Sequence, residues 1–200
     1  MQQHGTIAPA GTLTTKKITP PATPAPLLWK IRNLPHLLRA WRIPLALALR
    51  IPTVYGKLSM VHISAAGRRT DYGVVSYRVV TTAFVNEMVD QLQTEDSTWG
   101  DFKFHDSGVG TTAEDAGDTD IETTDGESRA TGTQTEGATA NIYRSVGTIS
   151  YTTTKAITEH GLFNASTAGE LMDRTVFAAR NVVNGDSIQF TYELTLTAGS

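Results

Sequence analysis

The chain of 200 residues contains no cysteine. It therefore has no disulfide and no thiolate nucleophile, and it offers no zinc site built from cysteine. It also lacks a long hydrophobic run. The most apolar stretch, Ile43 to Leu49, is interrupted by Pro44 and falls far short of the ~20 residues that a membrane-spanning helix needs.

Acidic residues are missing from one part of the chain. The first 70 residues contain ten Lys or Arg and no Asp or Glu, and the first acid is Asp71. The rest of the chain holds all 20 acids and seven of the 17 Lys and Arg. The net charge of -3 thus combines a basic N-terminal part with an acidic body. A basic segment of this kind favours an acidic partner: a protein shell, nucleic acid or anionic lipid.

Prolines divide the basic part. Because proline fixes φ and disfavours helix in the residue before it, the stretch up to residue 26 is predicted to be an extended tail. Between residues 27 and 52, leucines and tryptophans recur at helical spacing, and Pro35, Pro44 and Pro52 cut the stretch into short amphipathic helices. We therefore predict that residues 1–53 form an extended, proline-broken basic arm.

The apolar stripe of these short helices has to pack on something, because helices of this length are marginal alone in water. A neighbouring protein, an anionic membrane surface and the chain's own body are the three alternatives, and we favour a protein. The cations are dispersed among apolar residues, unlike those of a base-reading helix, so we expect no specific nucleic-acid binding. The predicted partner-binding residues are Trp29, Lys30, Arg32, Leu34, Leu38, Arg39, Trp41, Arg42 and Arg50.

Residues 54–200 are predicted to be a β-rich body. The clearest strand covers Ser187 to Thr197, where apolar and polar residues alternate. One helix is expected over Ala83 to Gln93, with Thr81 or Thr82 as its N-cap. Many short strands separated by glycine and polar turns, without a βαβ rhythm, favour an antiparallel sandwich or jelly roll. The fold class is therefore mainly β with one helix, preceded by the basic arm.

The body contains fragments of several functional motifs, but none is complete. Asp118, Asp120 and Glu122 lack the spacing of an EF-hand, because Thr123 occupies its glycine position. Adjacent residues on a strand point to opposite faces, so His105-Asp106 does not pair a catalytic base with the residue that orients it. We expect no enzymatic activity, cofactor or metal site. The stretch from 106 to 127, with eight acids and no base, is predicted to be a long solvated loop or a loosely held hairpin.

Several segments of the body resemble structural proteins of tailed bacteriophages. The resemblance covers most of the chain from Asp71 onward and is carried by DYGVVSYRVVTTAFVNEMVD (71–90), FHDSGVGTTAE (104–114), SRATGTQTEGATANIYRSVGTI (128–149), ITEHGLFNAS (157–166), LMDRTVF (171–177) and NGDSIQFTYELTLTAG (184–199). A basic arm containing Trp before such a body is also typical of these proteins.

The resemblance implies a virion structural protein without catalytic residues, located in virions assembled in the host cytoplasm. We expect a capsid decoration (cement) protein whose arm binds the major capsid protein or other virion subunits. Self-association into a homo-oligomer is also expected, and membrane binding is not. A neck, connector or fibre-anchoring tail component is the first alternative. A polysaccharide-binding surface module is the second, although the tyrosines that it would need are scattered.

Overall fold

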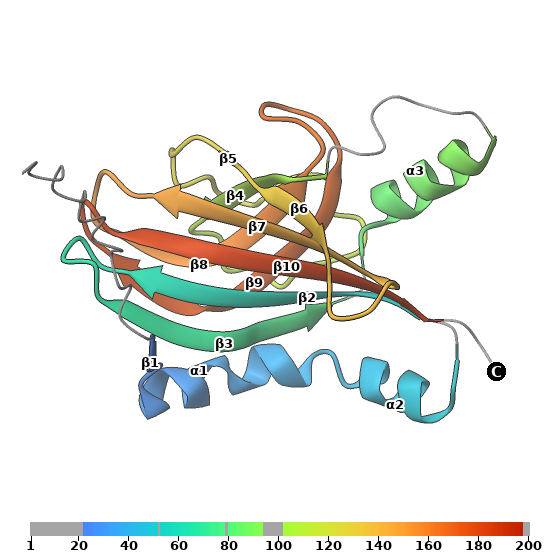
Figure 1. The fold of residues 1–200 in the computed structure, drawn as a ribbon, viewed down its shortest axis with the longest axis horizontal. Helices are drawn as coiled ribbons and strands as arrows, with labels where there is room; N and C mark the ends of the chain where they lie inside the picture. The colour runs from blue at the N-terminus through green and yellow to red at the C-terminus, as the bar shows by residue number, and fades with distance from the viewer. Residues whose placement is uncertain (1–21, 52, 79, 94–101, 198–200) are drawn as a thin grey trace, which may run out of the picture.

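The computed structural model describes residues 22–51, 53–78, 80–93 and 102–197, and these form a sandwich of two β-sheets (Figure 1). The first sheet has the strand order β1 (Thr23–Pro24), β3 (Arg69–Arg78), β2 (Thr53–Ile63), β10 (Ser187–Thr197), β7 (Ile142–Ser150) and β6 (Thr133–Glu136). The second has the order β5 (Ala130–Thr131), β4 (Phe104–Gly108), β8 (Lys155–Phe163) and β9 (Leu171–Val182). All neighbours are antiparallel except β1 and β3. The prediction of a mainly β, antiparallel sandwich is confirmed.

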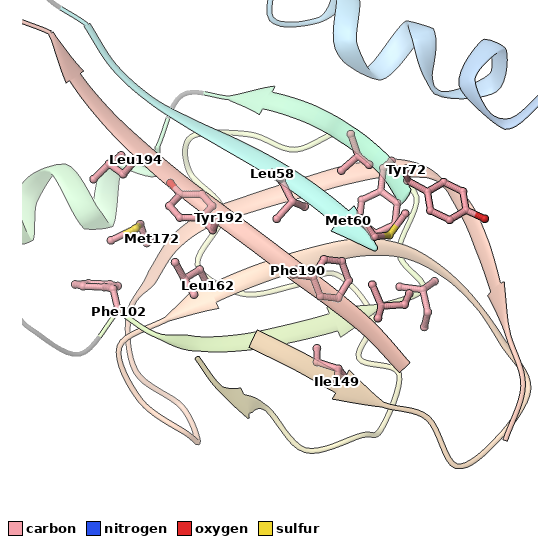
Figure 2. Packing of buried hydrophobic residues seen from close by; sticks show 14 of the residues in the cluster. Leu58, Met60, Tyr72, Phe102, Ile149, Leu162, Met172, Phe190, Tyr192 and Leu194 are labelled. Atoms are coloured by element: carbon pink, nitrogen blue, oxygen red, sulfur yellow. The ribbon is translucent and has the colours of Figure 1, made fainter. Parts of the chain in front are cut away.

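The core lies between the two sheets and follows from strand alternation. On β10, Ile188, Phe190 and Tyr192 are fully buried, whereas the residues between them are partly exposed. Figure 2 shows Phe190 and Tyr192 within the cluster of buried side chains. From the opposite sheet, Leu162 on β8 and Phe177 on β9 join the same cluster. Burial of each large apolar side chain contributes about 1.5–3 kcal/mol, so this layer supplies the main driving force that joins the sheets.

The helix predicted after the second long strand is present as α3 (Thr82–Gln93). The hydroxyl of Thr81 accepts a hydrogen bond from the backbone N–H of Phe84 at 3.2 Å, which is the geometry of an N-cap. Phe84 anchors the helix by an edge-on contact with Phe102, with ring centroids 5.2 Å apart. The residue ranges of this helix and its cap therefore agree with the sequence pattern.

Two short helices precede the long strands: α1 (Leu27–Leu38) and α2 (Arg42–Ala48) follow one another along the side of the sandwich next to β3 (Figure 1). The prolines do not delimit them as the sequence suggested. Pro35 lies inside α1, and Pro44 lies in the first turn of α2, where the missing N–H has no helical partner to lose. Residues 1–21 of the predicted tail lie outside the described residues.

The stretch between residues 106 and 127 begins in β4, and residues 109–123 form a largely exposed loop, as the composition predicts. Two of its acids are nevertheless paired with arginines of the body. Glu114 forms an ion pair with Arg78, and both side chains are largely buried. Asp106 pairs with Arg129, with 2.9 Å between Oδ2 and Nε. These two acids therefore form ion pairs with arginines that are distant in sequence, and the two pairs hold the stretch against the body.

Candidate functional site

The inner side of α1 is attached to the sandwich by two side chains one turn apart. The indole Nε1 of Trp29 donates a hydrogen bond to the carbonyl of Ala178 at 3.0 Å. The amide of Asn33 donates to the carbonyl of Val75 at 2.7 Å, and its oxygen accepts from the N–H of Ala178 at 2.9 Å. Trp29 also packs edge-on against Tyr72. Because Val75 lies on β3 and Ala178 on β9, α1 connects β3 of the first sheet with the edge strand of the second.

The opposite side of α1 carries the more apolar stripe and faces outward. Leu27, Ile31, Leu34 and Leu38 recur every three or four residues, the spacing of a single helix face, and are 73%, 58%, 50% and 62% exposed. A stripe of this spacing is normally buried against the protein's own core. Here the helix is oriented so that the stripe remains available to a partner.

The exposed apolar surface continues beyond the end of α1. Trp41, in the turn before α2, is exposed, as are Leu45 on α2 and Leu49 just after it. We call the set Leu27, Ile31, Leu34, Leu38, Trp41, Leu45 and Leu49, together with the cations between them, the outer face. Monomeric soluble proteins rarely expose large apolar patches, so the outer face is a candidate interaction surface.

The charges of the outer face are all positive. No Asp or Glu occurs between Leu27 and Ile51. Lys30, Arg32, Arg42 and Arg50 form no ion pair with any carboxylate in the described part of the chain. Arg39 reaches Glu114 at 3.4 Å, and the guanidinium of Arg42 lies 5.8 Å from the centre of the Trp41 ring. The outer face is therefore electrostatically suited to an acidic surface.

Arg50 occupies a backbone position that favours glycine. Its φ is 55°, in the left-handed region. The backbone N–H of Arg50 donates a hydrogen bond to the carbonyl of Leu47, and the N–H of Ile51 donates one to the carbonyl of Ala46. These are the two hydrogen bonds that close a helix in a Schellman motif. A side chain at such a position costs about 1 kcal/mol. A cation is thus held at the edge of the outer face despite local backbone strain.

The structure places the predicted binding residues on different sides of the two helices. Leu34, Leu38 and Trp41 lie on the outer face, whereas Trp29 is half-buried and faces the sandwich. Sequence reasoning missed Asn33, which is buried although it is polar. Its position one turn after Trp29 was the available signal, because a lone amide within an otherwise apolar and basic helix favours a specific hydrogen-bonded contact.

A groove also lies beside α2, and sequence reasoning missed its sheet side. It measures about 600 Å³ and is lined by apolar residues of α1, of α2 and of the turn between them. Tyr77 of β3 and Tyr55 of β2 complete the lining from the outer surface of the first sheet. Helix and sheet therefore build one continuous apolar surface.

The buried histidines of the body do not pair with their neighbours in sequence as a catalytic base pairs with the residue that orients it. His105 Nδ1 lies 2.9 Å from Nε2 of His160, and its Nε2 lies 2.8 Å from the hydroxyl of Ser145. All three residues are fully buried between the sheets. Burial lowers the pKa of His105 to about 3 and lowers that of His160 well below its ordinary value. At neutral pH both rings are uncharged, and a substrate does not reach them in this arrangement.

The carboxylates that suggested calcium bind an arginine. Arg174, on β9, pairs with Asp118 at 3.0 Å, with Glu122 at 3.3 Å and with the fully buried Glu159 at 2.8 Å. Its guanidinium thus lies among the oxygens that a cation would need. Within the described residues, no group of three or more potential metal ligands is assembled. None of the described helices is long and apolar enough to cross a membrane.

Comparisons with protein-family models, with curated proteins and with solved structures find no match to this chain. The outer face and the resemblance carried by the sequence of the body are therefore the two features of the chain that bear on its function.

Proposed function

We propose that this chain is a virion structural protein of a tailed bacteriophage, and that it acts as a capsid decoration (cement) protein bound to the head shell through the outer face. One observation carries the proposal: α1 turns its apolar stripe away from its own core, in a segment that contains cations but no acid between Leu27 and Ile51. A protein that worked alone would gain stability by burying that stripe.

The way in which α1 is held supports a role in binding. The hydrogen bonds of Trp29 and Asn33 attach the helix to both sheets, so its outer stripe is fixed before a partner arrives. A surface that is already ordered loses little conformational entropy on binding. Each exposed leucine that becomes buried contributes about 1.5–3 kcal/mol, and many copies on one lattice add avidity.

A neck, connector or fibre-anchoring tail component is the alternative station in the virion. The same basic and apolar face suits a ring of subunits as well as a shell lattice. The two proposals differ in copy number, because a lattice protein follows the number of shell subunits whereas a ring contributes only a few copies. Self-association as a homo-oligomer belongs to both proposals.

A polysaccharide-binding module gains less support from the geometry. Sugar-binding sites of that kind combine exposed aromatic rings with paired carboxylates. Tyr55, Tyr77 and Trp41 do gather along one groove, but no carboxylate lines it. Tyr72, Tyr151 and Tyr192 are buried in the core. The groove therefore lacks the carboxylates that a polysaccharide-binding site of this kind would need.

The proposal is tested by counting this chain in purified particles of the virus that encodes it. Quantitative mass spectrometry against the major shell protein gives the ratio of the two. A ratio equal to a simple fraction of the shell protein is the expected result. A count corresponding to one or two rings favours the neck or tail alternative, and absence from the particles contradicts a virion role altogether.

A further inference from the structure

The groove beside α2 has the dimensions of a site for an inserted side chain. Its volume of about 600 Å³ lies within the range of about 300–1,000 Å³ that is usual for ligand pockets. Leu38, Trp41 and Leu47 line it from the helices, and Tyr55 and Tyr77 line it from the sheet. An apolar side chain that enters from a partner would lose contact with water on several sides.

The chemistry around the groove selects the kind of segment that carries this side chain. Arg39 and Arg42 alternate along the chain with the lining residues Leu38 and Trp41, and no carboxylate lines the groove. Arg39 already reaches one carboxylate, that of Glu114, at 3.4 Å. Positive charge that flanks an apolar depression attracts an acidic chain and repels a basic one.

We propose that the groove receives an aliphatic or aromatic side chain from an acidic segment of the partner, whose carboxylates pair with Arg39 and Arg42. The proposal rests on the proposed function only in assigning that segment to a virion subunit. It adds Tyr55, Tyr77 and Leu47 to the binding surface, and it identifies the partner by its chemistry.

Charge and shape disfavour the other occupants of this surface. A second copy that docked through the same face would place two sets of unpaired arginines against each other, and like charges in an interface are repulsive. An anionic membrane would satisfy the charges, but it presents no single side chain that fills a concave groove. A protruding residue on an acidic protein segment satisfies both features.

The test uses the full-length chain and fluorescence anisotropy of labelled synthetic peptides. The probe is a peptide of alternating Glu and Leu. One twin replaces Glu by Lys, and another replaces Leu by Ser. We expect the probe to bind. Each twin should bind at least about tenfold more weakly, because it lacks one of the two required features. These comparisons need no variant and are independent of folding defects.

Matched variants then locate the site. Leu47→Glu places a carboxylate in the groove, whereas Leu92→Glu makes the same change at an exposed position of α3, outside the outer face. We expect about tenfold weaker probe binding for Leu47→Glu and less than about twofold change for Leu92→Glu. Equal effects of the two variants, or equal binding of all three peptides, overturn the proposal.

Two further outcomes also overturn it. One is binding to phosphatidylserine vesicles that Leu47→Glu weakens while peptide binding is absent, which assigns the groove to a membrane. The other is self-association that Leu47→Glu abolishes, which assigns it to a second copy. Failure of the groove proposal is distinguishable from failure of the virion role. If the chain is present in particles and the Leu47→Glu variant is incorporated at the same copy number, only the groove proposal is contradicted. If the chain binds the peptide but is absent from particles, only the virion role is contradicted.

Discussion

The side-chain amide of Asn33 donates a hydrogen bond to the backbone carbonyl of Val75 at 2.7 Å, so one polar residue of α1 is fixed to β3, which lies next to the short edge strand β1 of the first sheet. The oxygen of the same amide accepts from the N–H of Ala178, on the edge strand of the second sheet. The helix that carries the outer face is therefore built into the sandwich. Removal of residues 1–52 would expose both edges, so point substitutions are the sharper tools.

Replacement of Asn33 by Ala is expected to destabilise the protein by about 2–4 kcal/mol, because it leaves the buried carbonyl of Val75 and N–H of Ala178 without partners. The free energy of unfolding in urea measures this. Asn86→Ala, on the exposed side of α3, is the matched control, with an expected change within about 0.5 kcal/mol. An equal loss of unfolding free energy in the two variants would show that the hydrogen bonds of Asn33 do not stabilise the protein.

Replacement of Arg50 by Gly is expected to stabilise the fold by about 0.5–1 kcal/mol, because its φ of 55° strains any residue with a Cβ atom. Arg50→Ala keeps the Cβ atom and should bring no such gain. Thermal unfolding distinguishes the two variants. If the arginine is retained for binding, both variants weaken attachment to particles, even though only the glycine variant is more stable. A glycine variant no more stable than the alanine variant argues against strain at this position.

Replacement of Asp173 by Asn is expected to raise stability at pH 7–8 by roughly 1–3 kcal/mol. Burial raises the pKa of Asp173 from 3.8 to about 6, so above that pH its ionised form is penalised in the folded state only. As the pH falls through the window from 6 to 3.8, the folded protein takes up the proton first and the penalty disappears. The advantage of Asp173→Asn should vanish over the same window in unfolding titrations. An advantage that stays constant with pH points to packing instead.

The buried histidine pair predicts the opposite dependence on pH. His105 stays neutral in the folded protein down to a pKa of about 3 because it is buried, whereas it takes up a proton near pH 6.5 when unfolded. Stability is therefore lost as the pH falls below 6.5. His105→Gln should flatten that loss by about 1.4 kcal/mol per pH unit.

The comparison at pH 8 isolates the packing effect of His105→Gln, because the ring is neutral in both states there. The slope of the free energy of unfolding against pH, measured between pH 6.5 and 4, then reports the titration alone. A variant with the wild-type slope would mean that His105 does not remain uncharged in the core.

Local patterns predicted some elements closely and missed every long-range contact. The alternation over Ser187–Thr197 coincides with β10, because one face of this strand is buried and the other is solvated. The helix after Thr81 was visible from its cap and its apolar spacing. The pairing of Glu114 with Arg78 could not be predicted from the sequence, because local patterns do not indicate which distant residue forms an ion pair.

The exposed surface that we propose for binding could be identified from the sequence only in part, for the same reason. The sequence identifies Leu34, Leu38 and Trp41 as an apolar stripe among cations, and these side chains are exposed. It does not show which side of the helix faces the body, so Trp29 and Asn33 could not be separated from the stripe. Tyr55 and Tyr77 enter the surface only through the way that α2 lies beside the sheet.

We propose above all that the outer face attaches this chain to the virion. The most direct measurement is the number of copies per particle when the virus encodes Arg42→Glu, with Arg68→Glu as the control. Arg68 is also an exposed arginine, but it lies in the turn between β2 and β3. We expect Arg42→Glu to reduce the copy number about tenfold and Arg68→Glu to leave it unchanged. Wild-type copy number for Arg42→Glu, or equal losses for both variants, would contradict the account.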